Sequence, residues 1–77
     1  MNRIDLLIYL NECLKHARRF KSASIARTFY DQAFGAVSFY TRTIWKENQN
    51  EEHDMICIWE TEYRPRFEAC MRGEFEQ

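Results

Sequence analysis

The chain has 77 residues, of which 45% are hydrophobic and 30% are charged, and its formal net charge is −1. A chain of this length makes at most one domain and hides only about 60–65% of the surface that its unfolded form exposes. The composition is that of a folded protein rather than a disordered tail, and two glycines and one proline are too few for a small β-sandwich or for glycine-rich phosphate loops. We therefore expect one all-α domain over residues 1–77.

The first predicted helix spans residues 2–19. Its apolar stripe, within about 80° of Leu7 at about 100° per residue, consists of Ile4, Leu10, Leu14 and Ala17, flanked by Leu6, Cys13 and Phe20. The break follows at residues 20–24, where Ser22 or Ser24 can cap the next helix by accepting a hydrogen bond from a free backbone N–H. A turn this short predicts an antiparallel helical hairpin.

The second predicted helix spans residues 23–46 and is unusually apolar. Its main stripe, within about 60° of Ala33, consists of Ala26, Phe29, Ala36, Val37, Tyr40 and Ile44. Further aromatic and aliphatic residues widen the apolar arc to roughly 240° and leave a narrow polar strip of Thr28, Asp31, Gly35, Ser38 and Arg42. Such a helix must be covered on more than one side, so we expect it at the centre of the fold. Gly35 either permits a close backbone approach or marks a local bend.

A polar linker at residues 46–50 precedes the third predicted helix. Asn48 or Asn50 can cap this helix, which is expected to begin near Glu51. Its apolar stripe consists of Met55, Ile56, Trp59, Tyr63, Phe67, Cys70 and Met71. Pro65 lacks a backbone N–H and predicts a kink or restart. Gly73 predicts a left-handed C-terminal cap, and residues 73–77 are expected to form a frayed tail unless Phe75 folds back.

The three cysteines are odd in number and far apart in the sequence. Cys13, Cys57 and Cys70 form no C-x-x-C pair, so neither a disulfide framework nor a zinc knuckle is indicated. Free cysteine is among the most buried residue types. We expect all three to be small apolar core residues rather than reactive thiols.

Charge is distributed unevenly along the chain. Residues 1–46 hold eight basic and three acidic side chains, a balance of +5, whereas residues 47–77 hold three basic and nine acidic ones, a balance of −6. The candidate basic patch around the first turn consists of Lys15, Arg18, Arg19, Lys21 and Arg27. It is expected to be a solvated helix end or a charge match between subunits, and its alternative role is to hold a nucleic-acid backbone.

The sequence contains no constellation typical of an enzyme or a metal site. Glu12 and His16 are four residues apart on an exposed face, with His53 as a conceivable third ligand, but surface pairing is the expected role. No Ser or Cys stands at a motif spacing from a histidine, and Glu60, Glu62 and Glu68 lie on an outward face. We therefore expect no catalytic activity, no cofactor and no metal.

One resemblance concerns packing alone. Ala26, Tyr30 and Ala33, with Leu10 and Ala17 before them, resemble the second half of a tetratricopeptide repeat, in which small and aromatic residues interlock two antiparallel helices. The resemblance covers about half of one repeat. Leu14 stands where that family usually has glycine, and no peptide-binding role is carried over.

The aromatic excess predicts self-association. Small domains without disulfides or metals often complete their burial by forming oligomers, and two-fold dimers are the commonest. The candidate self-association or partner surface consists of Tyr30, Phe34, Phe39, Trp45 and Trp59. We expect a protein–protein interaction module, and the alternative is a nucleic-acid-associated regulator that binds through the basic turn. No run of 18 apolar residues and no secretory signal is present, so a cytoplasmic location without a membrane partner is expected.

Overall fold

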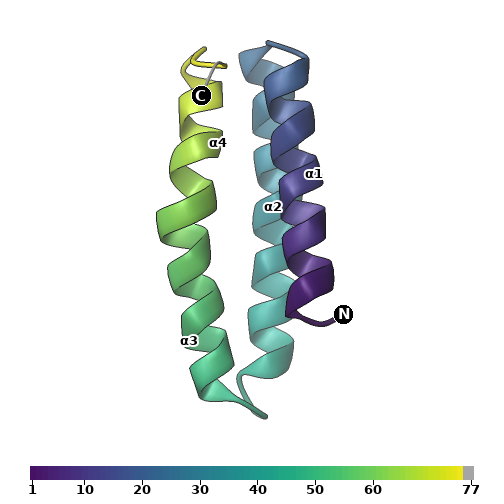
Figure 1. Cartoon of the computed structure of the whole chain (residues 1–77), viewed down its shortest axis with the longest axis vertical. Helices are drawn as coiled ribbons and strands as arrows, with labels where there is room; N and C mark the ends of the chain where they lie inside the picture. The colour runs from purple at the N-terminus through teal and green to yellow at the C-terminus, as the bar shows by residue number, and fades with distance from the viewer. Residues whose placement is uncertain (76–77) are drawn as a thin grey trace.

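The computed structural model describes residues 1–75 and contains three helical rods lying side by side (Figure 1). The first two are α1 (Arg3–Arg19) and α2 (Ala23–Ile44). The third rod is continuous and consists of α3 (Gln49–Ile58), the π-helical turn η1 (Trp59–Tyr63) and α4 (Arg64–Met71). Each rod runs antiparallel to the one before it. The described residues contain no strand, so the expected all-α, three-helix domain is confirmed.

Side-chain caps fix where the helices begin. The Asn2 side chain accepts a hydrogen bond from the Asp5 N–H at 2.9 Å, and Asp5 accepts one in return from the backbone of Asn2. Ser22 caps α2 and Asn48 caps α3 through the same i to i+3 hydrogen bond. Ser22 and Asn48, rather than Ser24 and Asn50, are therefore the capping residues. The second helix ends two residues earlier than predicted, and the third begins two residues earlier.

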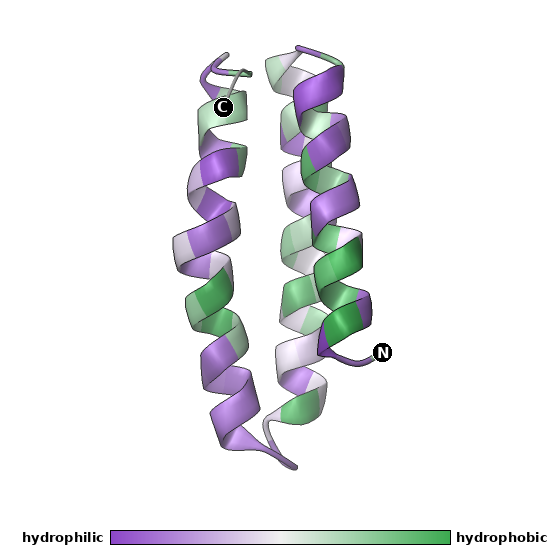
Figure 2. Cartoon of the chain, viewed as in Figure 1, coloured by the Kyte–Doolittle hydropathy of each residue, from purple (hydrophilic) through white to green (hydrophobic). Residues whose placement is uncertain are grey.

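The core lies along α2, which packs against α1 on one side and against the third rod on the other. In Figure 1, α2 lies behind the other two rods, and hydrophobic residues recur along all three in Figure 2. This confirms the expectation that the second helix is central. The largest fully buried side chains are Phe67, Leu6, Leu10, Met55 and Cys70.

The buried face of α1 is rotated from the predicted one. The sequence stripe was centred on Leu7, but Leu7 is half-buried and Ile4 is 67% exposed. Leu10, Leu14 and Ala17 of the predicted stripe are buried, together with Leu6 and Cys13 on one flank of it. The reason is that α1 packs mainly against α2 and contacts α4 much less, so the side of α1 that carries Ile4 is left uncovered.

The irregular segment of the third rod comes before Pro65 and extends over a full π turn. The Arg64 N–H donates to the Trp59 carbonyl, five residues back, and α4 then begins with Pro65 in its first turn. The expected restart at Pro65 is thus preceded by a wider turn. Its cause is the spacing of the buried side chains, which fall at every fourth residue: Met55, Trp59, Tyr63 and Phe67.

In a regular α-helix, three four-residue steps rotate a side chain by about 120° around the axis. The π turn accommodates one extra residue, which reduces this rotation by about 100°. All four side chains therefore face α2 and α1 from one straight rod.

The rod ends at Gly73, as predicted. Gly73 has a φ of 88°, a left-handed conformation that favours glycine. Its N–H donates to the Cys70 carbonyl at 3.0 Å, and the Glu74 N–H donates to the Ala69 carbonyl at 2.9 Å, a Schellman cap. Phe75 folds back and is half-buried against the core. Residues 76–77 of the predicted tail lie outside the described residues.

This explanation of the π turn can be tested by deleting its extra residue. We expect a variant that lacks Thr61 and carries Pro65→Ala to keep its helical circular dichroism. Its Tm should stay within about 5 °C of the parent's. The deletion leaves the core side chains at a spacing of four, three and four, which a regular α-helix accommodates.

The matched control is deletion of Gly35, which is exposed but lies in the regular helix α2. This deletion rotates the two halves of α2 by about 100° and removes Val37 and Tyr40 from the core. Thermal unfolding should lose its cooperativity. Equal damage from both deletions would contradict the explanation.

Candidate functional site

The predicted self-association surface divides into buried and exposed members. Trp59 is only 2% exposed and belongs to the core, so its inclusion in an accessible surface is wrong. Tyr30 is half-buried, with its ring 5.8 Å from Trp59 and 6.1 Å from Phe67. These rings, together with Phe34, cover the indole and remove it from solvent.

Phe34, Phe39 and Trp45 remain at the surface of α2, with exposed fractions of 48%, 62% and 42%. At about 100° per residue, Phe34 and Trp45 lie about 20° apart, whereas Phe39 lies about 140° from Phe34. Phe34 and Trp45 thus lie on one edge of the outward face of α2, and Phe39 lies on the opposite edge. We call this face the α2 outer face, and its centre is the polar strip predicted from the sequence: Thr28, Asp31, Gly35, Ser38 and Arg42.

Gly35 lies in the middle of the α2 outer face. Nothing lies within 4 Å of the position that a Cβ atom would occupy there. No part of the described chain therefore uses the close approach that this glycine permits. Gly35 also lies within an uninterrupted helix of 22 residues.

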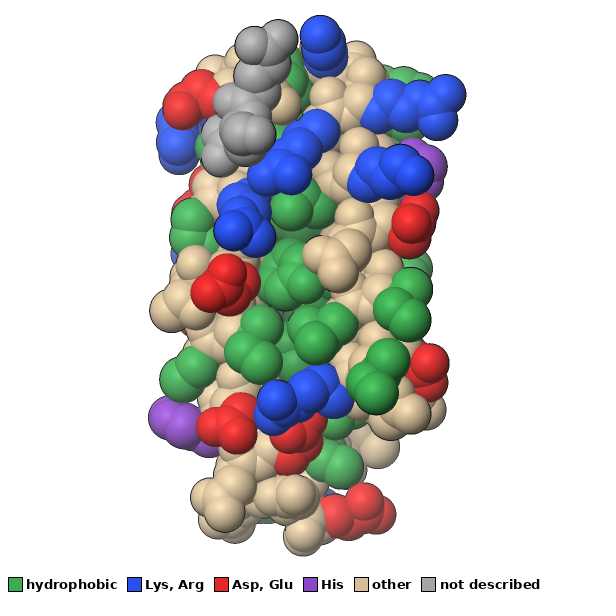
Figure 3. All heavy atoms as spheres, viewed as in Figure 1, with side chains coloured by type: hydrophobic (Ala, Val, Ile, Leu, Met, Phe, Trp, Pro, Cys, Tyr) green, Lys and Arg blue, Asp and Glu red, His purple; other side chains and the backbone are tan. Residues whose placement is uncertain are grey.

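A second group of exposed apolar side chains lies on α1. Ile4 and Ile8 are 67% and 58% exposed, and Met1 precedes them. Figure 3 shows hydrophobic side chains across the middle of the face formed by α1 and the third rod, with Lys and Arg side chains above them.

The predicted basic patch is only partly assembled. Lys15, Arg19 and Lys21 are exposed and form no ion pair within residues 1–75. Arg18 is half-buried beside Cys70, where it opposes the rise that burial causes in the pKa of that thiol. Arg27 departs from the patch because its Nε pairs with Asp31 at 3.2 Å.

His16 makes the surface pair that its spacing predicts. Its Nε2 lies 3.9 Å from Glu12, and its ring stacks on Phe29 with centroids 5.3 Å apart. The described residues contain no group of three or more His, Cys, Asp or Glu side chains that could hold a metal ion.

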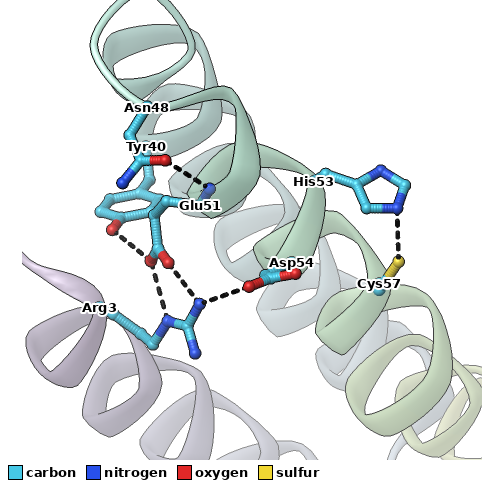
Figure 4. Close-up of polar contacts among 7 residues, drawn as sticks. All are labelled: Arg3, Tyr40, Asn48, Glu51, His53, Asp54 and Cys57. Carbon is cyan, nitrogen blue, oxygen red and sulfur yellow. Dashed lines mark hydrogen bonds and ion pairs between the residues drawn. The ribbon is translucent and has the colours of Figure 1, made fainter.

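Cys57 departs from the expected pattern. Cys13 and Cys70 are buried, and burial raises the pKa of both thiols, but Cys57 is exposed. It points away from the core because Met55 and Trp59 occupy the buried face of this part of the rod. Its Sγ lies 3.7 Å from Nε2 of His53, one helical turn earlier (Figure 4).

The predicted outward acidic face is neutralised in part by its own helix. Arg64 pairs with Glu60 at 2.9 Å and with Glu68 at 3.4 Å, and Arg66 lies 3.7 Å from Glu62. These are ion pairs between neighbouring turns, which stabilise a helix by a few tenths of a kcal/mol each.

A polar network joins all three rods at the end where α1 begins (Figure 4). The Arg3 Nε donates to Glu51 at 2.9 Å, and its Nη2 makes a second, shorter contact with the same carboxylate. The Tyr40 hydroxyl donates to Glu51 at 2.8 Å, and Arg3 also lies 3.5 Å from Asp54. The hydrogen bond from Arg3 is the main cause of the lowered pKa of Glu51, and burial raises the pKa of Tyr40.

Comparison with known protein families, characterised proteins and solved structures finds no match. No helix in the described part of the chain combines the length and apolarity needed to cross a membrane. The candidate site therefore depends on the geometry of this chain alone.

The network around Glu51 predicts an acid-sensitive contribution to stability. The folded state lowers the pKa of Glu51, so its contribution is complete above the usual pKa of glutamate and disappears as the pH falls through the lowered value. We expect Glu51→Gln to lower the urea midpoint at pH 7. The difference from the parent should shrink as the pH approaches 3.

Glu62→Gln is the matched control, because Glu62 is exposed and meets only Arg66. We expect it to leave the urea midpoint almost unchanged at every pH. A difference between Glu51→Gln and the parent that persists at pH 3 would refute the role of the Glu51 charge.

Proposed function

We propose that the protein is a small helical protein–protein interaction module that assembles with itself, most simply as a dimer, and has no catalytic activity of its own. The observation that carries the proposal is the exposure of Phe34, Phe39 and Trp45 on one helix whose opposite face already forms the core. Side chains of this size gain from burial, and aromatic residues are enriched at interfaces.

The size of the domain supports the same proposal. A 77-residue chain buries a smaller fraction of its surface than a larger domain does, and it has no disulfide bond within its described residues. Association of two copies adds burial that one copy lacks. The free thiols fit a reducing compartment, and we place the assembly in the cytoplasm.

The second candidate function is binding to nucleic acid through the basic patch. It is favoured by one observation: Lys15, Arg19 and Lys21 have no acidic partner among the described residues. The acidic third rod opposes it, because its carboxylates repel phosphate.

Salt dependence distinguishes this second candidate from self-association. A nucleic-acid complex should weaken steeply as salt rises, because neutralised phosphates release counterions. Changing Arg18, Arg19 and Lys21 to glutamate should then abolish binding to duplex or single-stranded DNA and leave the oligomer intact. We expect no binding of the parent to either DNA at 150 mM salt.

Self-association can be measured directly by sedimentation. We expect the parent to sediment above its chain mass of 9.4 kDa at micromolar concentration. Phe39→Glu and Trp45→Glu should shift it toward the monomer, because each places a charge in an apolar contact. Both side chains are exposed, so the helical content should not change.

Ile8→Glu is the control, since Ile8 is 58% exposed on a different helix. It should leave the sedimentation of the parent unchanged. Dissociation by Ile8→Glu but not by the α2 variants would move the interface to the other face. A parent that is monomeric up to about 100 μM would refute the proposal, since the Kd of any dimer would then lie above that concentration.

A further inference from the structure

The α2 outer face has the spacing of a helix that packs lengthwise on another helix. Seven of its residues alternate in steps of four and three: Ser24, Thr28, Asp31, Gly35, Ser38, Arg42 and Trp45. This is the spacing of a face along which one helix can lie lengthwise on another, although its centre is polar rather than apolar as in a coiled-coil seam. The seam lies opposite the buried Ala26, Ala33 and Val37, so α2 carries one occupied face and one unoccupied face. In Figure 1, α2 lies farthest from the viewer, behind α1 and the third rod.

We propose that a second copy of this chain occupies the α2 outer face, with the two α2 helices antiparallel and the two-fold axis passing between Ala36 and Val37. The inference rests on the proposed function, and it adds the orientation and register of the two copies. An interface around a two-fold axis must be complementary to itself. The exposed charges and rings of α2 meet this condition about the midpoint between Ala36 and Val37.

The charged residues of the seam are placed symmetrically about this midpoint. Asp31 lies as far before it as Arg42 lies after it, so Asp31 of each copy faces Arg42 of the partner subunit. Arg42 is exposed and forms no ion pair within the described chain. Asp31 pairs with Arg27 of its own helix at 3.2 Å, but its side chain is 61% exposed and can accept a second cation. The symmetry produces two such pairs in one dimer.

The aromatic residues obey the same symmetry. Phe34 lies level with Phe39 of the partner subunit but on the opposite edge of the contact, because the two residues are about 140° apart on the helix. Along each edge the ring of one copy therefore lies near the same ring of the partner subunit. Between the two edges, Gly35 faces Ser38 of the partner subunit. The space above Gly35 is open to 4 Å, so the backbones can approach closely and bring the flanking rings into contact. This arrangement gives Gly35 a role that no contact within the chain supplies.

The outermost pair extends the contact along most of the helix. Trp45 lies level with Thr28 of the partner subunit, and the seam between these two positions spans 17 steps of about 1.5 Å, or about 26 Å. The molecule is 39 Å long. The contact is therefore long enough to orient the two copies along their whole central helices.

A parallel arrangement is disfavoured by the same residues. In a parallel pair, Asp31 would face the partner's Asp31, and Arg42 would face the partner's Arg42. Like charges at such positions oppose association, whereas opposite charges select the antiparallel register. The charges thus specify orientation, and the aromatic rings supply most of the buried apolar surface.

Charge reversal tests the register in the full chain. We expect Asp31→Arg and Arg42→Asp each to raise the dimer Kd at least about tenfold, since each turns two attractive pairs into two repulsive ones. The double variant, with both reversals, restores opposite charges across the axis. Its Kd should return to within about threefold of the parent's. Glu62→Arg, an exposed reversal on the third rod, is the control and should have no effect on the Kd.

Cysteine cross-linking reports the register independently. In a Cys57→Ser background, chains carrying Gly35→Cys are mixed with chains carrying Ser38→Cys and oxidised. Disulfide formation needs Cα atoms within about 7 Å, so the mixed pair should cross-link faster than either variant alone. The remaining thiols, Cys13 and Cys70, are buried.

The outcomes separate this inference from the proposed function. A dimer that tolerates each single reversal, or in which identical cysteines cross-link fastest, overturns the antiparallel register and leaves self-association standing. A parent that is monomeric up to about 100 μM overturns both. Recovery by the double reversal together with preferential mixed cross-linking supports both.

Discussion

Burial of α2 between α1 and the third rod is the constraint on which the rest of the arrangement depends. The apolar residues of α2 cover far more of its circumference than one neighbouring helix can shield, so two rods must lie against it. With α2 in the centre, α1 and the third rod meet each other only weakly. This leaves two kinds of exposed apolar side chain: the flank of α1 that faces no rod, and the edges of α2 that neither rod reaches.

Two polar contacts compensate for the weak apolar contact between α1 and the third rod. At the end where α1 begins, Arg3 and Tyr40 hold Glu51 from two different helices. Farther along, the Tyr63 hydroxyl donates to Asn11 at 3.0 Å, which joins α1 to the π turn. Hydrogen bonds to a charged group are among the stronger ones in proteins. They fix the position of α1 against the third rod, where apolar packing alone leaves it less determined.

Most of the fold could be predicted because its signals are local. Asn48, Ser22 and Gly73 act at helix ends within a few residues of themselves, and the α2 stripe is strong enough to define its buried face. The Arg3–Glu51 pair could not be predicted, since 48 residues separate its members and nothing in either neighbourhood indicates the other. Cys57 was misplaced because a residue type's average burial says nothing about which face of the helix it occupies.

Trp59 shows how a correct observation gives a wrong assignment. The residue was recognised both as part of an apolar stripe and as part of an aromatic excess, and these two properties place it on different surfaces. The four-residue spacing of the stripe decides between them, because the π turn keeps Trp59 in line with Met55 and Tyr63. The same spacing was the available signal for the π turn itself, since a regular helix cannot keep four such residues on one face.

The two faces of α2 differ in the kinds of residue that they present. The inner face is apolar and small, with Ala26, Ala33 and Val37, and such a face packs densely but tolerates several neighbours of similar shape. The outer face alternates charges, small residues and rings, so it gains less from burial and discriminates more strongly between partners. A protein of this size can therefore use one helix for two tasks. Folding depends on the amount of apolar surface on the inner face, and in the proposed dimer recognition depends on the order of residues along the outer one.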